Sequence, residues 1–490
     1  DNKNELQLVL DQPEGSTLEG TDRMVRAFED YLRSVPEVTN FVSYVGQPSP
    51  MDFNGMVRHY YLRDQPHLAD IRINLVGKNE RRMQSHALGL RLRNDLEDLA
   101  QHFGATLQIV ETPPGPPVLA TVVAEIYGAP GLDYEDIINA TSQVTKVMAD
   151  EPFVVDLNTT IEMPRTRLDF LPDKEKAALH GISTAAITET LKLAVSGSNP
   201  ATLHLDDERQ PLFVNAILPR DQRTGAQALD RLHLISADGQ PVPLTELGRF
   251  VGRPEAQTIY HKNLRPVVYV TAEMAGQAPG EAILDMQKTL RQEPTPAGID
   301  VQWDGEGEWE ITIRVFRDLG LAFGTAMIGV YILLTLQTGS FVLPLLILMS
   351  IPFTVIGIMP GFWLLNLLMD RPVGGFADPV FFTATGMIGM IALGGIVIRN
   401  AVVLIDFIRR ALEEGMPLRE AIVECGAVRL RPIVLTAITT ALGAWPITLD
   451  PIFSGLAWAM IFGLFSSTLF TLVVVPVAFY AVYQRHYAVQ

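Results

Sequence analysis

Five long apolar stretches in the last 180 residues constrain the fold of this chain more than any other feature. They cover about residues 315–336, 341–367, 380–407, 431–449 and 456–482. A helix that rises 1.5 Å per residue needs about 20 apolar residues to cross the hydrocarbon core of a bilayer. Each stretch is therefore predicted to form a transmembrane helix, and short links join one helix to the next.

Charge divides the chain near residue 310. Residues 311–490 carry 10 Lys and Arg and 9 Asp and Glu, whereas residues 1–310 carry 28 and 46. The whole chain has a net charge of −17 and no basic stripe. Because phosphate groups are bound by clustered Lys and Arg, the chain is predicted not to bind nucleic acid. The sequence thus predicts an acidic water-exposed part followed by an all-helical membrane part.

The usual signatures of catalytic and metal sites are missing from the sequence. The single cysteine, Cys425, excludes a disulfide scaffold and a zinc or iron–sulfur site built from several cysteines. The nine histidines show neither H-x3-H nor HExxH spacing, and no Walker-type lysine motif occurs. We therefore expect no bound metal, no cofactor and no ATP hydrolysis on this chain.

Basic residues near the ends of the apolar stretches predict the orientation. The link 408–430 holds Arg409, Arg410, Arg419 and Arg429, whereas the loop 369–379 holds one arginine. The positive-inside rule then places the 408–430 link and the C-terminus in the cytoplasm, and residues 1–310 on the outer side. Arg314 and Arg317 oppose this orientation weakly. An outer part of this size has to be translocated, so we expect this chain to be the C-terminal portion of a longer protein.

Arg399 lies well inside the third apolar stretch, 19 residues after Val380 and 8 before Phe407. A charge at this depth is costly unless it is paired, so it marks either a functional group or a structural ion pair. Asp406 is seven residues further on, on the same helical face, but near the cytoplasmic end. No other acidic residue of the chain is expected at matching depth in another span. The partner of Arg399 is therefore expected to lie outside this chain.

The fourth apolar stretch begins next to a second group of polar residues. Arg429 precedes Thr436 by seven residues, which places both on one helical face, and Thr439 and Thr440 continue the polar stripe. Arg429 and the nearby Arg431 also fit a simpler role as anchors at the membrane surface.

Residues 1–112 show the periodicities of a ferredoxin-like βαβ-βαβ unit. Alternating apolar residues predict strands at about 6–10, 38–45, 71–75 and 106–110, and helical spacing predicts helices at about 18–35 and 81–103. A proline-rich segment at 113–117 ends this unit.

A second unit of the same kind is predicted after that segment, interrupted by an insertion. Its strands are expected at about 121–127, 154–159, 267–272 and 300–303, and its helices at 134–150 and 280–290. The second unit is thus assigned to residues 113–161 and 264–308, and the insert to 162–263. Within the insert, Ala237-Asp238-Gly239-Gln240 predicts a hairpin turn.

Residues 46–68 form a long stretch without regular periodicity, and such loops inside compact domains are often functional. Met51, Phe53 and Met56 are candidates for lining an apolar substrate cleft, because methionine adapts to varied ligands. The alternative is an exposed loop that packs only on its own domain.

The chain resembles the C-terminal half of a resistance–nodulation–division (RND) efflux transporter of the amphiphile-exporting, multidrug type. The resemblance is strongest at three segments, Ser236–Pro243 of the insert, Gly395–Ala401 of the third span and Arg429–Thr436 of the fourth. It implies an α+β part plus an all-α membrane domain at 309–490. The two ferredoxin-like units would be porter subdomains, and the 162–263 insert a funnel or docking subdomain.

The resemblance also implies partners and a location. Such a pump sits in the bacterial inner membrane as a homotrimer, with residues 1–310 in the periplasm and the C-terminus in the cytoplasm. It works with a periplasmic adaptor and an outer-membrane channel, and exports a small-molecule substrate by antiport with protons. It is a transporter and not an enzyme. The alternatives are a metal-ion or lipid exporter of the same superfamily, or a membrane-anchored assembly module without transport. We expect metal export to be disfavoured, because the outer part has no Met or His/Cys cluster suited to soft metal ions.

In that family a basic residue of the tenth span, with an Arg and a Thr of the eleventh, surrounds two carboxylates of the fourth span. Arg399, Arg429 and Thr436 match these positions, which implies a proton relay whose carboxylates come from the N-terminal half. The tenth-span residue of the family is usually Lys, and here it is Arg399. Because arginine keeps its proton at any relevant pH, Arg399 is expected to act as a fixed countercharge and not as a proton carrier.

Overall fold

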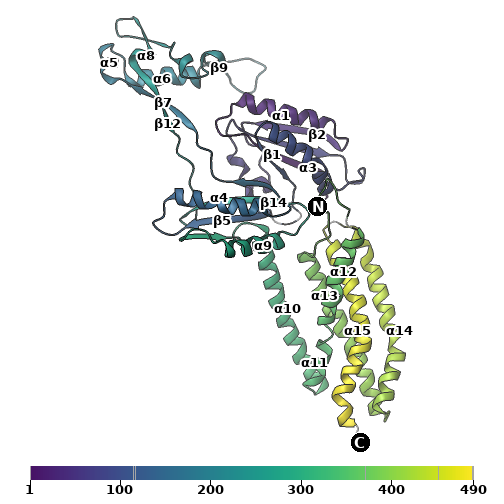
Figure 1. The fold of residues 1–490 in the computed structure, drawn as a ribbon. Coiled ribbons are helices and arrows are strands. Elements are labelled where there is room, and N and C mark those ends of the chain that lie inside the picture. The colour runs from purple at the N-terminus through teal and green to yellow at the C-terminus, as the bar shows by residue number, and fades with distance from the viewer. Residues whose placement is uncertain (1, 114, 116, 370, 451, 488–490) are drawn as a thin grey trace. The chain divides into compact units, whose positions relative to one another are not determined.

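The computed structural model describes residues 2–487 except 114, 116, 370 and 451 (Figure 1). The chain forms two compact units. One comprises the residues up to Ile161 and those from Ile259 onward, and the other is Glu162–Thr258. The larger unit contains two β-sheets with their helices and a set of long apolar helices.

The first sheet has four strands in the order β2-β3-β1-β4, and all neighbours are antiparallel. Its strands are β1 (Glu5–Asp11), β2 (Val38–Val45), β3 (Leu68–Leu75) and β4 (Thr106–Val110). Helices α1 (Leu18–Arg33) and α3 (Ser85–His102) pack against it. Alternate residues of β1, such as Leu8 and Leu10, are buried against α1 residues such as Phe28. Each fully buried side chain of this size contributes about 1.5–3 kcal/mol.

The second sheet repeats this pattern around the insertion. Its strands are β5 (Val122–Gly128), β6 (Val154–Thr159), β13 (Tyr260–Lys262), β14 (Arg265–Met274) and β15 (Ile299–Gln302). The order is β13-β14-β5-β15, and β6 also pairs with β14. Helices α4 (Tyr134–Asp150) and α9 (Pro279–Gln292) bury their apolar side chains against this sheet. The sequence assigned residues up to 263 to the insert, but β13 belongs to the second sheet because it forms a hairpin with β14.

The smaller unit, Glu162–Thr258, is built from three two-stranded ribbons and short helices. Its strands are β7 (Thr166–Pro172), β8 (Ser198–Leu203), β9 (Leu212–Ala216), β10 (His233–Ile235), β11 (Pro241–Pro243) and β12 (Gly248–Pro254). Its helices are α5 (Lys174–Leu179), α6 (Thr184–Val195), α7 (Ala226–Leu229), α8 (Leu244–Leu247) and the 3-10 turn η2 (Arg220–Gln222). The predicted hairpin is confirmed, because β10 and β11 pair across residues 236–240.

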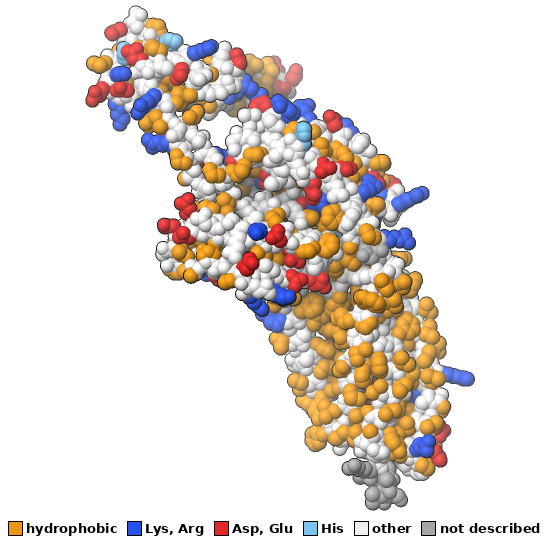
Figure 2. Space-filling model, viewed as in Figure 1, with side chains coloured by type: hydrophobic (Ala, Val, Ile, Leu, Met, Phe, Trp, Pro, Cys, Tyr) orange, Lys and Arg blue, Asp and Glu red, His pale blue; other side chains and the backbone are white. Residues whose placement is uncertain are grey.

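The long helices follow β15. They are α10 (Glu308–Thr338), α11 (Val342–Leu348), α12 (Pro352–Met369), α13 (Ala384–Glu413), α14 (Leu418–Ala444), η3 (Trp445–Leu449) and α15 (Ser454–Tyr487). Among the described residues, five segments are long and apolar enough to cross a membrane. In Figure 2, hydrophobic side chains cover the visible surface of these helices, whereas charged side chains concentrate elsewhere.

The helices differ from the predicted apolar ranges at their ends. The second span consists of two helices, because Pro352 lacks an N–H group and starts a new helix. Helix α14 begins at Leu418, thirteen residues before the predicted start at 431. Polar residues can extend a helix beyond the hydrocarbon core, so an apolar run marks the membrane segment and not the helix ends.

The long loop predicted at residues 46–68 contains two short helices, α2 (Phe53–Val57) and the 3-10 helix η1 (Tyr60–Leu62). Asp52 caps α2, because its Oδ1 accepts a hydrogen bond of 2.6 Å from the backbone N–H of Gly55. Helices this short leave little periodicity, and for that reason the sequence pattern did not reveal them.

Candidate functional site

Arg399 lies near the middle of α13, and its side chain is exposed. It belongs to an exposed stripe of α13 that consists of Ile388, Ala392, Gly395, Arg399, Val403, Asp406 and Arg410. The opposite face of α13 is buried, as shown by Leu393, Val397 and Leu404, with exposed fractions of at most 1%. Arg399 therefore points away from the packed side of its helix.

No described residue forms a hydrogen bond or an ion pair with Arg399. Asp406, on the same stripe, instead pairs with Arg410 at 2.7 Å. An unpaired charge in the middle of a transmembrane helix costs about 2.5–3.5 kcal/mol. The geometry therefore leaves a cationic group that needs an anionic partner.

Arg429 and Thr436 lie on α14, the next helix. The guanidinium carbon of Arg429 lies 5.0 Å from the centre of the Phe407 ring of α13, which is a cation–π contact. Its Nε is buried and has no hydrogen-bond partner among the described residues. Thr436 is exposed, and its hydroxyl donates to the carbonyls of Pro432 and Ile433 in its own helix.

The described contacts do not join Arg399, Arg429 and Thr436 directly. Phe407, the ring beneath Arg429, follows Arg399 by eight residues, or about 12 Å along the helix axis. Arg429 thus lies against α13 about two turns toward the predicted cytoplasmic end, and a relay among the three residues would need further groups between them.

Met51, Phe53 and Met56 are exposed, with exposed fractions of 64%, 64% and 45%. The loop that carries them is fixed to the first sheet on both sides. Before α2, the backbone N–H of Ser49 donates to Asp70 at 3.3 Å. After η1, Arg63 forms ion pairs with Asp11 and Asp70, at 2.6 and 2.9 Å. The three apolar side chains are therefore presented on an anchored loop.

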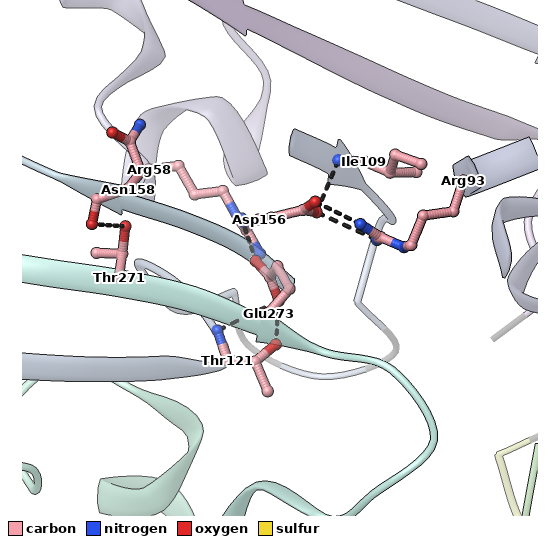
Figure 3. Close-up of polar contacts among 8 residues, drawn as sticks. All are labelled: Arg58, Arg93, Ile109, Thr121, Asp156, Asn158, Thr271 and Glu273. Carbon is pink, nitrogen blue, oxygen red and sulfur yellow. Dashed lines mark hydrogen bonds and ion pairs between the residues drawn. The ribbon is translucent and has the colours of Figure 1, made fainter. Parts of the chain in front are cut away.

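Four buried charges connect the two sheets and form a group that the sequence did not single out. We call Arg58, Arg93, Asp156 and Glu273 the inter-sheet charge cluster (Figure 3). Arg93 of α3 forms a two-point ion pair with Asp156 of β6. Arg58, which follows α2, pairs with Glu273 of β14 at 2.8 Å. The exposed fractions of these four side chains range from 1% to 16%, so both pairs are largely shielded from water.

A β-bulge directs Asp156 toward the first sheet. Thr271 of β14 pairs with Asn158 and Glu273 pairs with Val155, so that Asp156 and Leu157 together face one residue of β14. The φ angle of Asp156 is +55°, a left-handed conformation that Asp tolerates better than most residues. The turned carboxylate accepts a hydrogen bond of 2.9 Å from the backbone N–H of Ile109 in β4.

Burial and pairing act in opposite directions on these groups. Burial raises the pKa of Asp156 above its ordinary value, although Arg93 opposes that shift. Burial disfavours the charged form of Arg58, but the neighbouring Glu273 raises the pKa of Arg58 above its ordinary value. Both arginines stay charged, and the hydroxyl and backbone N–H of Thr121 also donate to Glu273.

The sequence contained a weak signal for this cluster. Asp156 interrupts the apolar run Val154-Val155-Asp156-Leu157, and Arg93 follows a leucine on the buried side of α3. A charged residue in such a run suggests a buried ion pair, but its partner cannot be identified without the fold.

The described residues contain no group of three or more His, Cys, Asp or Glu side chains that could hold a metal ion. Cys425 is buried, and its thiol contacts the carbonyl of Leu404 at 3.4 Å.

Comparison with known proteins gives a family match over nearly the whole chain. A sequence model of the AcrB/AcrD/AcrF family matches residues 1–483. The swarming motility protein SwrC of Bacillus subtilis is 30% identical over 350 residues, which are 70% of this chain and 32% of SwrC. The cobalt-zinc-cadmium resistance protein CzcA of Cupriavidus metallidurans is 26% identical over 374 residues, 74% of this chain and 33% of CzcA.

A solved structure has the same fold. It is the crystal structure of a heavy metal efflux pump, with a TM-score of 0.75 and 21% sequence identity. The match covers 98% of this chain and 47% of that pump. The chain thus spans about a third of the length of these curated relatives and about half of the solved pump.

Proposed function

Because the chain belongs to the AcrB/AcrD/AcrF family of RND transporters, we propose that it forms the C-terminal half of a proton-driven efflux pump. One observation carries the proposal beyond family membership. Arg399 lies unpaired among the described residues, on the face of α13 that these residues leave uncovered. Such a charge is expected to face its partner in the assembled pump.

The partner we propose is a pair of carboxylates on the N-terminal half. When they are ionised, they pair with Arg399, and when they bind protons, the pairing weakens. Since arginine stays protonated, Arg399 provides a constant charge against which the carboxylates titrate. Arg429 and Thr436 complete this relay from α14. The resulting shift of the helices drives alternating access of the outer part, and no cofactor is needed.

For the outer part, we propose two porter subdomains of ferredoxin-like type, residues 1–112 and residues 113–161 with 264–308. The insert, 162–263, is proposed to be the docking subdomain. The pump would be a homotrimer in the bacterial inner membrane, with residues 1–310 in the periplasm and the C-terminus in the cytoplasm. A periplasmic adaptor and an outer-membrane channel would complete the export path.

As cargo, we propose a metal ion, in place of the amphiphile that the sequence favoured. The support comes from relatives, since CzcA is named for cobalt, zinc and cadmium resistance and NccA for nickel, cobalt and cadmium resistance. The described residues offer no ready-made metal cluster, so the ion would be held by few ligands, or together with groups of the N-terminal half.

A small amphiphile is the second candidate cargo. It is favoured by the exposed Met51, Phe53 and Met56, which present an apolar surface without charged ligands.

The full-length transporter, reconstituted in liposomes with a pH gradient, tests both parts of this proposal. Accumulation of Zn²⁺, Co²⁺ or Cd²⁺ is followed with a trapped metal indicator, and accumulation of a fluorescent amphiphilic cation is followed in parallel. Metal accumulation that depends on the gradient would support the first cargo, and accumulation of the dye alone would support the second.

The role of Arg399 is tested in the same assay. Arg399→Ala is expected to abolish gradient-driven transport, and Arg399→Lys to retain part of it because the charge is kept. Arg410→Ala is the matched control, since Arg410 lies on the same stripe of α13 but pairs with Asp406. Transport by Arg399→Ala at the wild-type rate would contradict the proposed relay.

A further inference from the structure

The loop between α12 and α13, residues 371–383, has a rigid internal structure. Val373 and Phe376 exchange two backbone hydrogen bonds, of 2.8 and 3.0 Å, around a two-residue turn. Gly374 and Gly375 occupy this turn with φ angles of +61° and +88°, which favour glycine. Further along, the side-chain amide of Asn366 in α12 forms two hydrogen bonds with the backbone of Val380, of 2.9 and 3.2 Å. The loop is therefore fixed to the end of α12.

The tip of this loop contacts the helical layer of the first sheet. The side-chain amide of Asn94 in α3 donates a hydrogen bond of 3.0 Å to the carbonyl oxygen of Gly374. The approach is so close that a Cβ atom at Gly374 would collide with the carbonyl oxygen of Leu90 in α3. A Cβ atom at Gly375 would meet nothing within 4 Å. Only Gly374 is therefore required to be glycine by contact with α3.

The same loop also contacts the second sheet's layer. Gly276 lies between β14 and α9, and a Cβ atom there would lie 3.0 Å from the carbonyl oxygen of Ala377. The loop thus touches both sheets within a span of four residues, from Gly374 to Ala377.

We propose that the α12–α13 loop is the element that transmits movement of α13 to the two sheets. The inference rests on the proposed function, because it assumes that the pairing of Arg399 changes during transport. Arg399 lies 15 residues after the start of α13, and the loop directly precedes that start. Because a packed helix moves as a stiff rod, a displacement at Arg399 reaches the loop with little loss.

The chain connections explain why such a contact is needed. The second sheet is joined to the membrane helices covalently, since α10 follows β15 within a few residues. In the described part of the chain, the first sheet is followed by the second sheet and not by a membrane helix. The contact of Gly374 with Leu90 and Asn94 therefore gives the first sheet a direct link to α13.

The experiment compares Gly374→Ala with Gly375→Ala in the full-length transporter. Both variants place an alanine at a positive φ angle, so their backbone strain is similar, but only Gly374→Ala disturbs the contact with α3. Gly374→Ala is expected to lower gradient-driven export about tenfold, in the range found for coupling residues, and Gly375→Ala to leave it within about twofold of the wild-type rate. Equal rates for the two variants would overturn the proposal.

A second readout does not depend on the cargo. Spin labels at the exposed positions 26 of α1 and 146 of α4 report the distance between the two sheets' helical layers by pulsed electron paramagnetic resonance. The distance is expected to change with pH in the wild type and in Gly375→Ala, but not in Gly374→Ala. If Gly374→Ala does not fold, Asn94→Ala, which removes only a hydrogen bond from an exposed side chain, takes its place.

The outcomes separate the two proposals. If the wild type and the loop variants change distance alike, the coupling role of the loop is wrong and the proton-driven function stands. If the wild type shows neither export nor a pH-dependent distance change, the proposed function fails, and the coupling role fails with it.

Discussion

Arg93 of α3 and Asp156 of β6 form an ion pair whose side chains have exposed fractions of 6% and 1%. The pair crosses from the first sheet's helix to a strand of the second sheet, and the second contact, from Nη2 to Oδ2, is 3.2 Å long. Charges this deeply buried must lose their hydration, so the pair is favourable only while its geometry is kept. The arrangement therefore favours one relative position of the two sheets.

Replacement of Arg93 by methionine is expected to destabilise the protein strongly. Asp156 would remain buried with its hydrogen bond from Ile109 but without a counterion. Loss of one partner of a buried pair costs about 3–5 kcal/mol, and the lower end is expected here because Asp156 can take up a proton. Thermal denaturation of the purified full-length protein measures the effect. Arg26→Met, which breaks an exposed pair with Asp22, is the control and should leave the melting temperature nearly unchanged.

Removal of both charges is expected to be milder than the two single changes imply. Asp156→Asn removes the carboxylate but keeps a residue that tolerates the left-handed conformation. In the double variant with Arg93→Met, neither charge is left unpaired by the other, so the two changes should couple by about 1–3 kcal/mol. A double-mutant cycle on the melting curves gives this coupling. Strictly additive effects would show that the pair contributes nothing beyond its separate parts.

The sequence was sufficient for elements whose pattern is local. Leu6, Leu8 and Leu10 alternate in a strand, and β1 was found there because one face of that strand is buried against helices. The membrane helices were predicted because a bilayer requires a long apolar run. Arg399 stood out for the same reason, since a charge in such a run has no local explanation.

Features that depend on distant partners could not be predicted. Arg58 and Glu273 are separated by 215 residues, and neither lies in a pattern that indicates the other. The bulge at Asp156 depends on how β6 pairs with β14, which periodicity does not report. The contact of Gly374 with Leu90 likewise depends on tertiary packing, because two glycines in a loop indicate a turn but not what the turn touches.

His86, in the first turn of α3, is expected to make stability depend on pH. A hydrogen bond of 2.7 Å with Glu111 raises the pKa of His86 above its ordinary value, against the effect of burial, and Asp378 adds to the shift. The folded state therefore favours the protonated ring. The stabilisation is fully present below the unfolded pKa of about 6.5 and is lost as the pH rises through the raised folded-state pKa.

His86→Gln should accordingly lower the melting temperature most at about pH 5.5, and the difference from the wild type should shrink toward about pH 9. The same substitution at the exposed His204 is the control and should show no such trend. A difference that grew with pH would mean that His86 stabilises the fold as a neutral ring.

Gly357 and Gly361, four residues apart on α12, let α15 approach closely. A Cβ atom at Gly357 would collide with Ser466, and one at Gly361 with the ring of Phe462. Small residues at this spacing are typical of tightly packed membrane helices. Gly361→Ala is therefore expected to destabilise the helix pair by about 1–3 kcal/mol, because the ring of Phe462 must move.

Gly329→Ala in α10 is the matched control for this change. A Cβ atom at Gly329 would meet nothing within 4 Å, so alanine should act only through its helix propensity and raise stability by up to about 1 kcal/mol. The two substitutions are thus expected to shift the melting temperature of the lipid-reconstituted protein in opposite directions. If Gly361→Ala also raised the melting temperature, helix propensity would outweigh packing, and α12 and α15 would not depend on this close approach.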